Sequence, residues 1–238
     1  MILIVIGSLG FVFLYVGVPW LYGRLARMLL KRKARRRNAL VLTFDDGPGS
    51  RLTPAVLNVL GENNARATFF ILGRNVEGRE AIARQLAAGG HEICSHGYDH
   101  VHQWKVSPFR ALSDIKRGWK AIDDALGTER RKYPFRPPNG KLNIICLLYL
   151  IFLQVPIVYW SEDSGDTWSV KPQADRVALM AGKAGGAVSL AHDFDRSDDK
   201  TDRFVLESTR AALAMAQERD MCVLTVSQLL NNGRKVID

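Results

Sequence analysis

Cysteine is scarce in this chain of 238 residues, and no two cysteines form a C-x-x-C pair. The three that occur, Cys94, Cys146 and Cys222, are widely separated. An odd number at such spacing argues against a disulfide framework and against a cysteine-bound zinc site. Free cysteine is among the most buried residue types, so we expect buried thiols with a packing role.

Charged side chains are absent from residues 1–23, whereas residues 24–37 hold eight basic side chains and no acidic one. The formal net charge of +9 first suggests a nucleic-acid partner. Outside that short block, however, 25 basic residues balance 24 acidic ones. The body of the protein therefore carries almost no net charge, and we expect no nucleic-acid partner.

The uncharged stretch Met1–Gly23 predicts an uncleaved transmembrane anchor, because about 20 apolar residues span a bilayer core. A signal peptide would carry its basic residues before the apolar run, whereas here they follow it. Residues 24–38 then form a basic juxtamembrane segment suited to anionic headgroups. Basic flanks favour the cytoplasmic side, so we expect a cytoplasmic globular domain at residues 39–238, with an extracytoplasmic one as the alternative.

Strand-like and helix-like patterns alternate seven times through residues 39–238. Apolar, β-branched runs predict strands at 39–44, 67–72, 91–95, 133–136, 156–160, 187–191 and 221–226. Helical patterns predict helices at 53–61, 77–88, 107–126, 141–153, 172–182 and 202–219. Such alternation indicates an α/β fold with a parallel sheet, and seven units favour a distorted (β/α)7 barrel over an open sheet.

Two segments allow more than one interpretation. Residues 142–160 are apolar enough to resemble a second membrane span, but polar residues and Pro156 interrupt them. A buried helix followed by a central strand is the main interpretation, with partial membrane contact as the alternative. Residues 193–202 are rich in acid and predict a solvated loop.

Polar residues gather after the predicted strands, at the end of a barrel where active sites lie. Asp45 and Asp46 follow the first strand, and His96 and His100 follow the third. Two imidazoles and a carboxylate are a frequent set for catalytic zinc. Later strand ends carry Arg136 with Asn139, then Asp163, Asp166 and Trp168, and then Leu190 with His192. Each cluster alone is weak, but their repetition at successive strand ends indicates an active site.

These clusters resemble the five motifs of the polysaccharide deacetylase (NodB-homology) family of carbohydrate esterases, across residues 39–230. The first reads Thr-Phe-Asp-Asp-Gly-Pro and the fifth Leu-Ala-His, both matching the family pattern. The second carries Gly97 where the family has Ser or Thr. The third has Asn139 in place of an aromatic residue, and the fourth has Thr167 inserted before Trp168.

The resemblance implies a role for each of these residues. Asp46, His96 and His100 would bind a divalent metal, with zinc as the default and cobalt, nickel or manganese as alternatives. Asp45 would be the catalytic base, oriented by Arg136, and His192 the acid, supported by Asp166. The Asn139 N–H would stabilise the oxyanion, while Trp168 and Leu190 would line the acyl pocket.

We therefore expect a membrane-anchored, metal-dependent amidase that removes an acetyl or formyl group from an amino sugar. Its place beside the cytoplasmic membrane face favours a polyprenyl-linked sugar. The alternative substrate is an extracytoplasmic polymer such as peptidoglycan, a chitin-like chain or an exopolysaccharide. A remote alternative is an inactive barrel that only binds sugar or metal.

Overall fold

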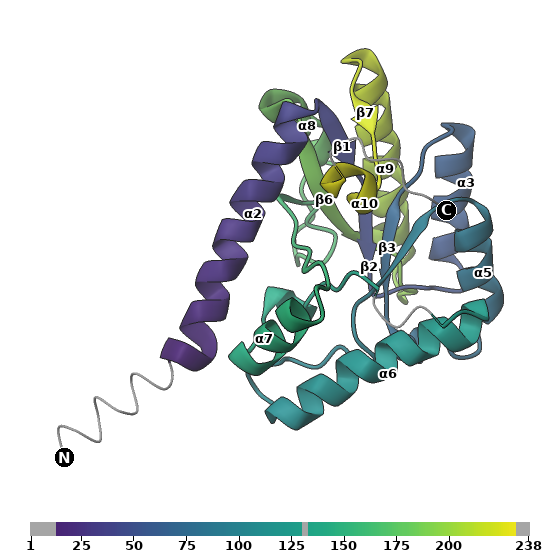
Figure 1. The fold of residues 1–238 in the computed structure, drawn as a ribbon. Coiled ribbons are helices and arrows are strands. Elements are labelled where there is room, and N and C mark those ends of the chain that lie inside the picture. The colour runs from purple at the N-terminus through teal and green to yellow at the C-terminus, as the bar shows by residue number, and fades with distance from the viewer. Residues whose placement is uncertain (1–12, 130–132, 232–238) are drawn as a thin grey trace.

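The computed structural model describes residues 13–129 and 133–231, and a parallel seven-stranded sheet lies at its centre (Figure 1). The strands are β1 Ala39–Val41, β2 Thr43–Asp45, β3 Thr68–Ile71, β4 Glu92–Ser95, β5 Glu162–Asp163, β6 Ala187–His192 and β7 Cys222–Val223. Their backbone pairing is parallel throughout. The predicted α/β class with a parallel sheet is confirmed.

The pairing runs from strand to strand until it returns to its start. Strand β2 pairs with β3 on one side and with β6 on the other, and β3 pairs with β4. From β4 the sequence of pairs continues through single bridges, Ser95 to Phe135 and Phe135 to Ile157. The chain after Ile157 then reaches β5, which pairs with β6. The strand ends consequently converge on one opening, as in a barrel.

Two predicted strands are much shorter than expected. The segment 133–136 contributes only Phe135 to the sheet, and 156–160 only Ile157. The final strand ends at Val223, because Thr225 caps the short helix α10, Val226–Leu230, through a capping box. Strand β5, by contrast, was not predicted; it consists of two residues, too few for a hydrophobic pattern to reveal.

Helices cover the outside of the sheet, and most lie where their patterns predict them. Ser107 caps the helix α6 and Pro108 is its first residue, in agreement with the helix predicted at 107–126. The helix predicted at 77–88 begins three residues later, at Glu80 in α5, and a short helix, α4, precedes the predicted range. The described helices are α2 Val18–Arg36, α3 Leu52–Glu62, α4 Gly73–Val76, α5 Glu80–Ala88, α6 Pro108–Leu126, α7 Ile144–Phe152, α8 Arg176–Ala184, α9 Asp199–Glu218 and α10, with short turns η1 Phe13–Gly17 and η2 Pro138–Gly140.

Helix α2 packs along the side of the sheet opposite α3 and α5 (Figure 1). Leu30 and Ala34 are buried in a small cluster with Val41 and Val188 of the sheet. Gly186 leaves room for this packing, since a Cβ there would lie 2.5 Å from the Ala34 backbone. The basic segment predicted at 24–38 is therefore helical up to Arg36 and continuous with the residues before it.

The membrane anchor predicted at residues 1–23 lies largely outside the described residues. Within the described ranges, no helix has the length and apolar character needed to cross a bilayer. Helix α2 nevertheless exposes a series of large apolar side chains, comprising Trp20, Leu21, Leu25, Met28 and Leu29.

Helix α7 is apolar on both its faces. Cys146, Leu147 and Leu150 are buried in the core. The opposite face is exposed to solvent at Ile145, Leu148, Ile151 and Phe152. The prediction of a buried helix is thus confirmed for one face of α7 and wrong for the other.

The prediction of buried cysteines is confirmed for Cys94 and Cys146 but wrong for Cys222, which is exposed on the short edge strand β7.

Replacing Leu30 with Ala tests whether α2 is part of the folded domain. Because Leu30 is only 7% exposed, we expect the free energy of unfolding to fall by about 2–4 kcal/mol. Met28→Ala is the matched control: Met28 is 59% exposed, so the change should stay within about 0.5 kcal/mol. Urea unfolding followed by tryptophan fluorescence measures both. Equal effects would contradict the packing of α2 on the sheet.

Candidate active site

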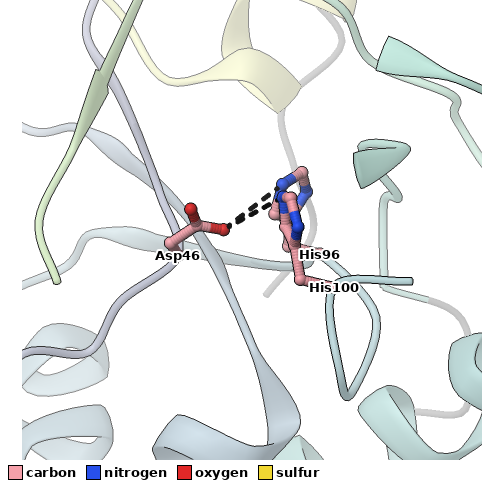
Figure 2. Close-up of side chains that lie close together, drawn as sticks. All are labelled: Asp46, His96 and His100. Carbon is pink, nitrogen blue, oxygen red and sulfur yellow. Dashed lines mark ion pairs between the residues drawn. The ribbon is translucent and has the colours of Figure 1, made fainter. Parts of the chain in front are cut away.

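Three side chains converge beyond the carboxyl ends of β2 and β4 (Figure 2). Asp46 follows β2, whereas His96 and His100 follow β4. The Oδ1 atom of Asp46 lies 3.6 Å from Nε2 of His96 and 3.5 Å from Nε2 of His100. These are the three residues that the sequence predicts as metal ligands, and the structure brings them together.

Unusual backbone conformations aim these side chains at one another. Asp46 has φ of 68° and His100 φ of 58°, both in the left-handed region that residues other than glycine rarely adopt. Such conformations cost about 1–3 kcal/mol each and cluster at functional sites. In Asp46 the turn places its carboxylate beside the imidazoles, although the preceding Asp45 belongs to a regular strand.

Steric restriction accounts for glycine at position 97 in the second motif. Gly97 has φ of +85°, and a Cβ at this position would overlap the carboxylate of Asp114 on α6. Asp114 in turn accepts the N–H of Asp99 at 2.7 Å and so holds the loop that carries both histidines. A serine or threonine at position 97 would need a left-handed backbone and a displaced Asp114 carboxylate, so glycine has a physical reason at this place.

A backbone carbonyl fixes the tautomer of His96. Its Nδ1 lies 2.8 Å from the carbonyl oxygen of Arg136, which can only accept a hydrogen bond. Nδ1 therefore carries the proton, and Nε2 turns a lone pair toward Asp46. Burial lowers the pKa of His96 to about 3, so the ring is neutral and able to act as a ligand at physiological pH.

The three residues fit a divalent metal by their chemistry. The Oδ1 atom of Asp46 is buried and has no hydrogen-bond partner among the described residues. A buried carboxylate oxygen without a partner is costly, and a cation would relieve that cost. Two imidazole nitrogens and one carboxylate oxygen are ligands that zinc and neighbouring transition metals accept.

Asp45 forms a buried ion pair beside the metal ligands. Its Oδ1 accepts a hydrogen bond of 2.7 Å from Nη1 of Arg136, whose side chain is fully buried. Its Oδ2 lies 3.7 Å from Nε2 of His96. Burial raises the pKa of Asp45, while the charges of Arg136 and His192 oppose the rise. The carboxylate thus lies next to the metal position with an affinity for protons above the ordinary value.

A second pair lies at the end of β6. Nδ1 of His192 lies 3.0 Å from Oδ1 of Asp166, which also accepts a hydrogen bond from Ser164. Burial disfavours a charged imidazole, but the hydrogen bond and charge of Asp166 outweigh it and raise the pKa of His192 to about 9. His192 is therefore protonated at neutral pH, as the predicted acid must be.

Arg196 and Asp193 belong to this region and were not predicted. Nη2 of Arg196 donates to Asp166 at 2.8 Å. Asp193 is fully buried, accepts a hydrogen bond from Thr53, and lies against Gly47. The interpretation of 193–202 as a solvated loop is therefore wrong at its start, where Asp193 is buried, and at its end, where residues 199–202 belong to α9. The available signal was their place close behind the Leu-Ala-His motif, with Asp193 next to His192 and Arg196 four residues beyond it.

The remaining predicted residues lie on loops around the site or in the sheet. Asn139 is exposed, at the centre of the turn η2, with φ of 56°. The hydrogen bonds of this turn use the N–H groups of Gly140 and Lys141. Leu190 is buried in β6, and Trp168 is 42% exposed on the loop after β5. Their roles at the oxyanion and the acyl group stay predictions.

Fold and site together define an α/β barrel-like protein with a candidate metal-ligand triad close to a buried Asp–Arg pair and a buried His–Asp pair. The sequence profile described as polysaccharide deacetylase matches residues 32–155. A chitooligosaccharide deacetylase from Rhizobium leguminosarum bv. phaseoli is 30% identical over 212 residues, covering 85% of this chain and 91% of that protein. The chain belongs to the polysaccharide deacetylase family.

Other relatives are named as peptidoglycan deacetylases. Peptidoglycan-N-acetylglucosamine deacetylase PgdA from Listeria monocytogenes serotype 1/2a is 34% identical over 169 residues, 69% of this chain but 34% of that protein. The chain therefore spans about a third of the length of this relative. The structure of peptidoglycan deacetylase PdaC from Bacillus subtilis superposes with a TM-score of 0.69 at 25% identity, covering 82% of this chain and 91% of that one.

Replacing His100 with Ala tests the ligand triad. The loss of one ligand should weaken binding of zinc by about 100-fold or more, because even changes in residues supporting a ligand cost 10–100-fold. Isothermal titration with zinc measures the affinity. His102→Ala removes a neighbouring histidine outside the triad and should leave zinc binding unchanged. Equal affinity of both variants would refute the assignment of His100.

The pKa of His192 predicts the pH dependence of turnover. The protonated form is lost as pH rises through about 9, so the rate should fall above that pH. Asp166→Asn removes the partner that raises the pKa while burial still lowers it. The fall in rate should therefore move to lower pH. A pH–rate profile tests this, with the exposed Asp175→Asn as control; an unmoved profile would contradict the pairing.

Proposed function

We propose that this protein hydrolyses the N-acyl amide, acetyl or formyl, of an amino sugar with the help of a divalent metal, with zinc as the expected ion. The observation that carries the proposal is that the candidate metal-ligand triad lies beside Asp45, which is in register with the protonated His192 on the neighbouring strand. An inactive, sugar-binding barrel would have no need for both a buried base and a buried acid. The names of the relatives agree with amide hydrolysis on sugars.

The described residues supply each proton transfer that the hydrolysis needs. A bound cation would polarise the amide carbonyl and lower the pKa of the attacking water. Asp45 accepts the proton of that water, and its raised pKa brings it closer to the operating pH. Arg136 holds the carboxylate in place at 2.7 Å. His192 donates the proton that converts the departing nitrogen into an amine.

The oxyanion that forms during the attack needs hydrogen-bond donors. The Asn139 N–H, in the turn between Pro138 and Gly140, is the proposed donor, and one such donor is worth about 3 kcal/mol. Leu190 and Trp168 are the proposed walls for the acyl group.

The proposed place of action is a membrane surface. Helix α2 combines exposed apolar side chains with basic residues, and η1 at its start contacts α7, whose outer face is also apolar. On this basis a polyprenyl-linked amino sugar at the cytoplasmic face is the first candidate substrate. Peptidoglycan on the outer side is the second, since it is the substrate that several relatives are named for.

Asp45→Asn tests the chemistry. Without its base, the zinc-loaded protein should lose about 10²–10⁴-fold in kcat for release of acetate from N-acetylglucosamine oligomers. Zinc stoichiometry, measured by atomic emission, should stay unchanged, because Asp45 is not among the proposed ligands. The exposed Asp124→Asn is the control. Full activity of Asp45→Asn would refute the proposed base.

Membrane topology separates the two candidate substrates. A C-terminal reporter pair, one active only in the cytoplasm and one only outside it, reads the side on which the domain lies. The basic residues of α2 predict a cytoplasmic signal. A signal from the exterior would exclude the cytoplasmic lipid-linked sugar and leave peptidoglycan or another outer polymer.

A further inference from the structure

Helix α2 brings one arginine to the edge of the active site. The guanidinium carbon of Arg27 lies 4.9 Å from the centre of the Tyr159 ring and 4.7 Å from that of Trp160. Its Nη2 lies against Gly140, where an added Cβ would be 2.6 Å away. Arg27 thus packs on the turn that carries Asn139, although it comes from a helix outside the five motifs.

Arg27 and the arginine of the catalytic pair share a neighbour. The guanidinium carbon of Arg136 lies 5.7 Å from the centre of the same Trp160 ring. Arg136 is fully buried and bound to Asp45, whereas Arg27 is only partly buried. One indole therefore contacts both the arginine that holds the proposed base and a second arginine nearer to solvent.

The charge of Arg27 is not compensated within residues 13–129 and 133–231, where it forms no ion pair with a carboxylate. Other basic residues of α2 do have polar partners there: Lys31 pairs with Glu162 at 2.8 Å, and Lys33 donates to the carbonyl of Leu230. Burial and the nearby charge of Arg136 lower the pKa of Arg27. A partly desolvated guanidinium held on two rings is well prepared for an anion.

We propose that Arg27 binds a negatively charged group of the substrate, a phosphate ester or a carboxylate, next to the acylated amino sugar. This inference rests on the proposed function and adds the class of substrate. The planar guanidinium can bind either group with two parallel hydrogen bonds. A lipid-linked sugar would supply phosphate at this place, whereas a peptidoglycan strand would supply the carboxylate of the neighbouring sugar. An uncharged chitin-like chain would supply neither.

Three substrates with the same N-acetylglucosamine unit separate these possibilities. Diacetylchitobiose is neutral, the disaccharide of N-acetylglucosamine and N-acetylmuramic acid carries a carboxylate, and an alkyl diphosphate ester of N-acetylglucosamine carries phosphate. The variant is Arg27→Met, which keeps an apolar stem on the rings. Arg24→Met is the matched control, since Arg24 is an exposed arginine that stacks on Trp20 at 5.0 Å. Thermal unfolding checks that both variants are folded.

The result expected is selective. Arg27→Met should raise KM by about 10- to 100-fold for one charged substrate, as for the loss of charged hydrogen bonds, with little change in kcat. Its kinetics on diacetylchitobiose should change less than about twofold, and Arg24→Met should behave like the original protein. A selective loss on the diphosphate ester identifies the lipid-linked source, and one on the disaccharide identifies the peptidoglycan source.

Two results would overturn the proposal: an equal loss on all three substrates, which indicates a structural role, or no loss on either charged one. A zinc-loaded original protein that releases no acetate from any substrate would contradict the proposed function instead. In that case calorimetric titration with N-acetylglucosamine 1-phosphate still decides the role of Arg27. Weaker binding by Arg27→Met than by Arg24→Met supports the anion site, and equal binding refutes it.

Discussion

The buried ion pair between Arg136 and Asp45 is the interaction on which the site depends. Arg136 donates to Asp45, to Thr43 and to the carbonyl of Tyr159, so one guanidinium joins β2 to the segment that follows Ile157. Its own carbonyl fixes the tautomer of His96. Loss of either charge would leave the other buried and unpaired, at a cost of about 3–5 kcal/mol. The same residue thus stabilises the fold and orients both the proposed base and a candidate metal ligand.

The site residues could be predicted from the sequence because they directly follow predicted strands. In a parallel sheet the carboxyl ends of all strands lie on one side, so polar clusters after successive strands must meet. Asp46 and His96 are 50 positions apart in the chain; their places after strands predicted the same end of the sheet, and the resemblance to the deacetylase motifs implied their role as ligands. The segment around Arg136 was equally recognisable, although only Phe135 in it has sheet pairing.

Features that depend on distant packing could not be predicted in this way. Glycine is favoured at position 97 because the carboxylate of Asp114 fills the space of a Cβ. Asp114 belongs to a helix whose orientation the sequence does not specify. Arg196 looks like one charge in an acid-rich loop until the structure places it on Asp166. Arg27 lies in a basic block that indicated only a membrane surface. In each case the residue type is common, and its role follows only from the partner that the structure places beside it.

The direction of α2 relative to the strands explains why Arg27 lies near the active site. Ala34 packs on Gly186, just before β6 begins, whereas Arg27 packs on Gly140, beyond the end of the strand region at Phe135. The helix therefore runs antiparallel to the strands, and residues at its beginning lie at the active-site end of the sheet. If the N-terminal segment is attached to a membrane, as proposed, the membrane surface would face the active-site end of the sheet. A substrate whose charged group lies at that surface would then meet Arg27 before its amide meets Asp45.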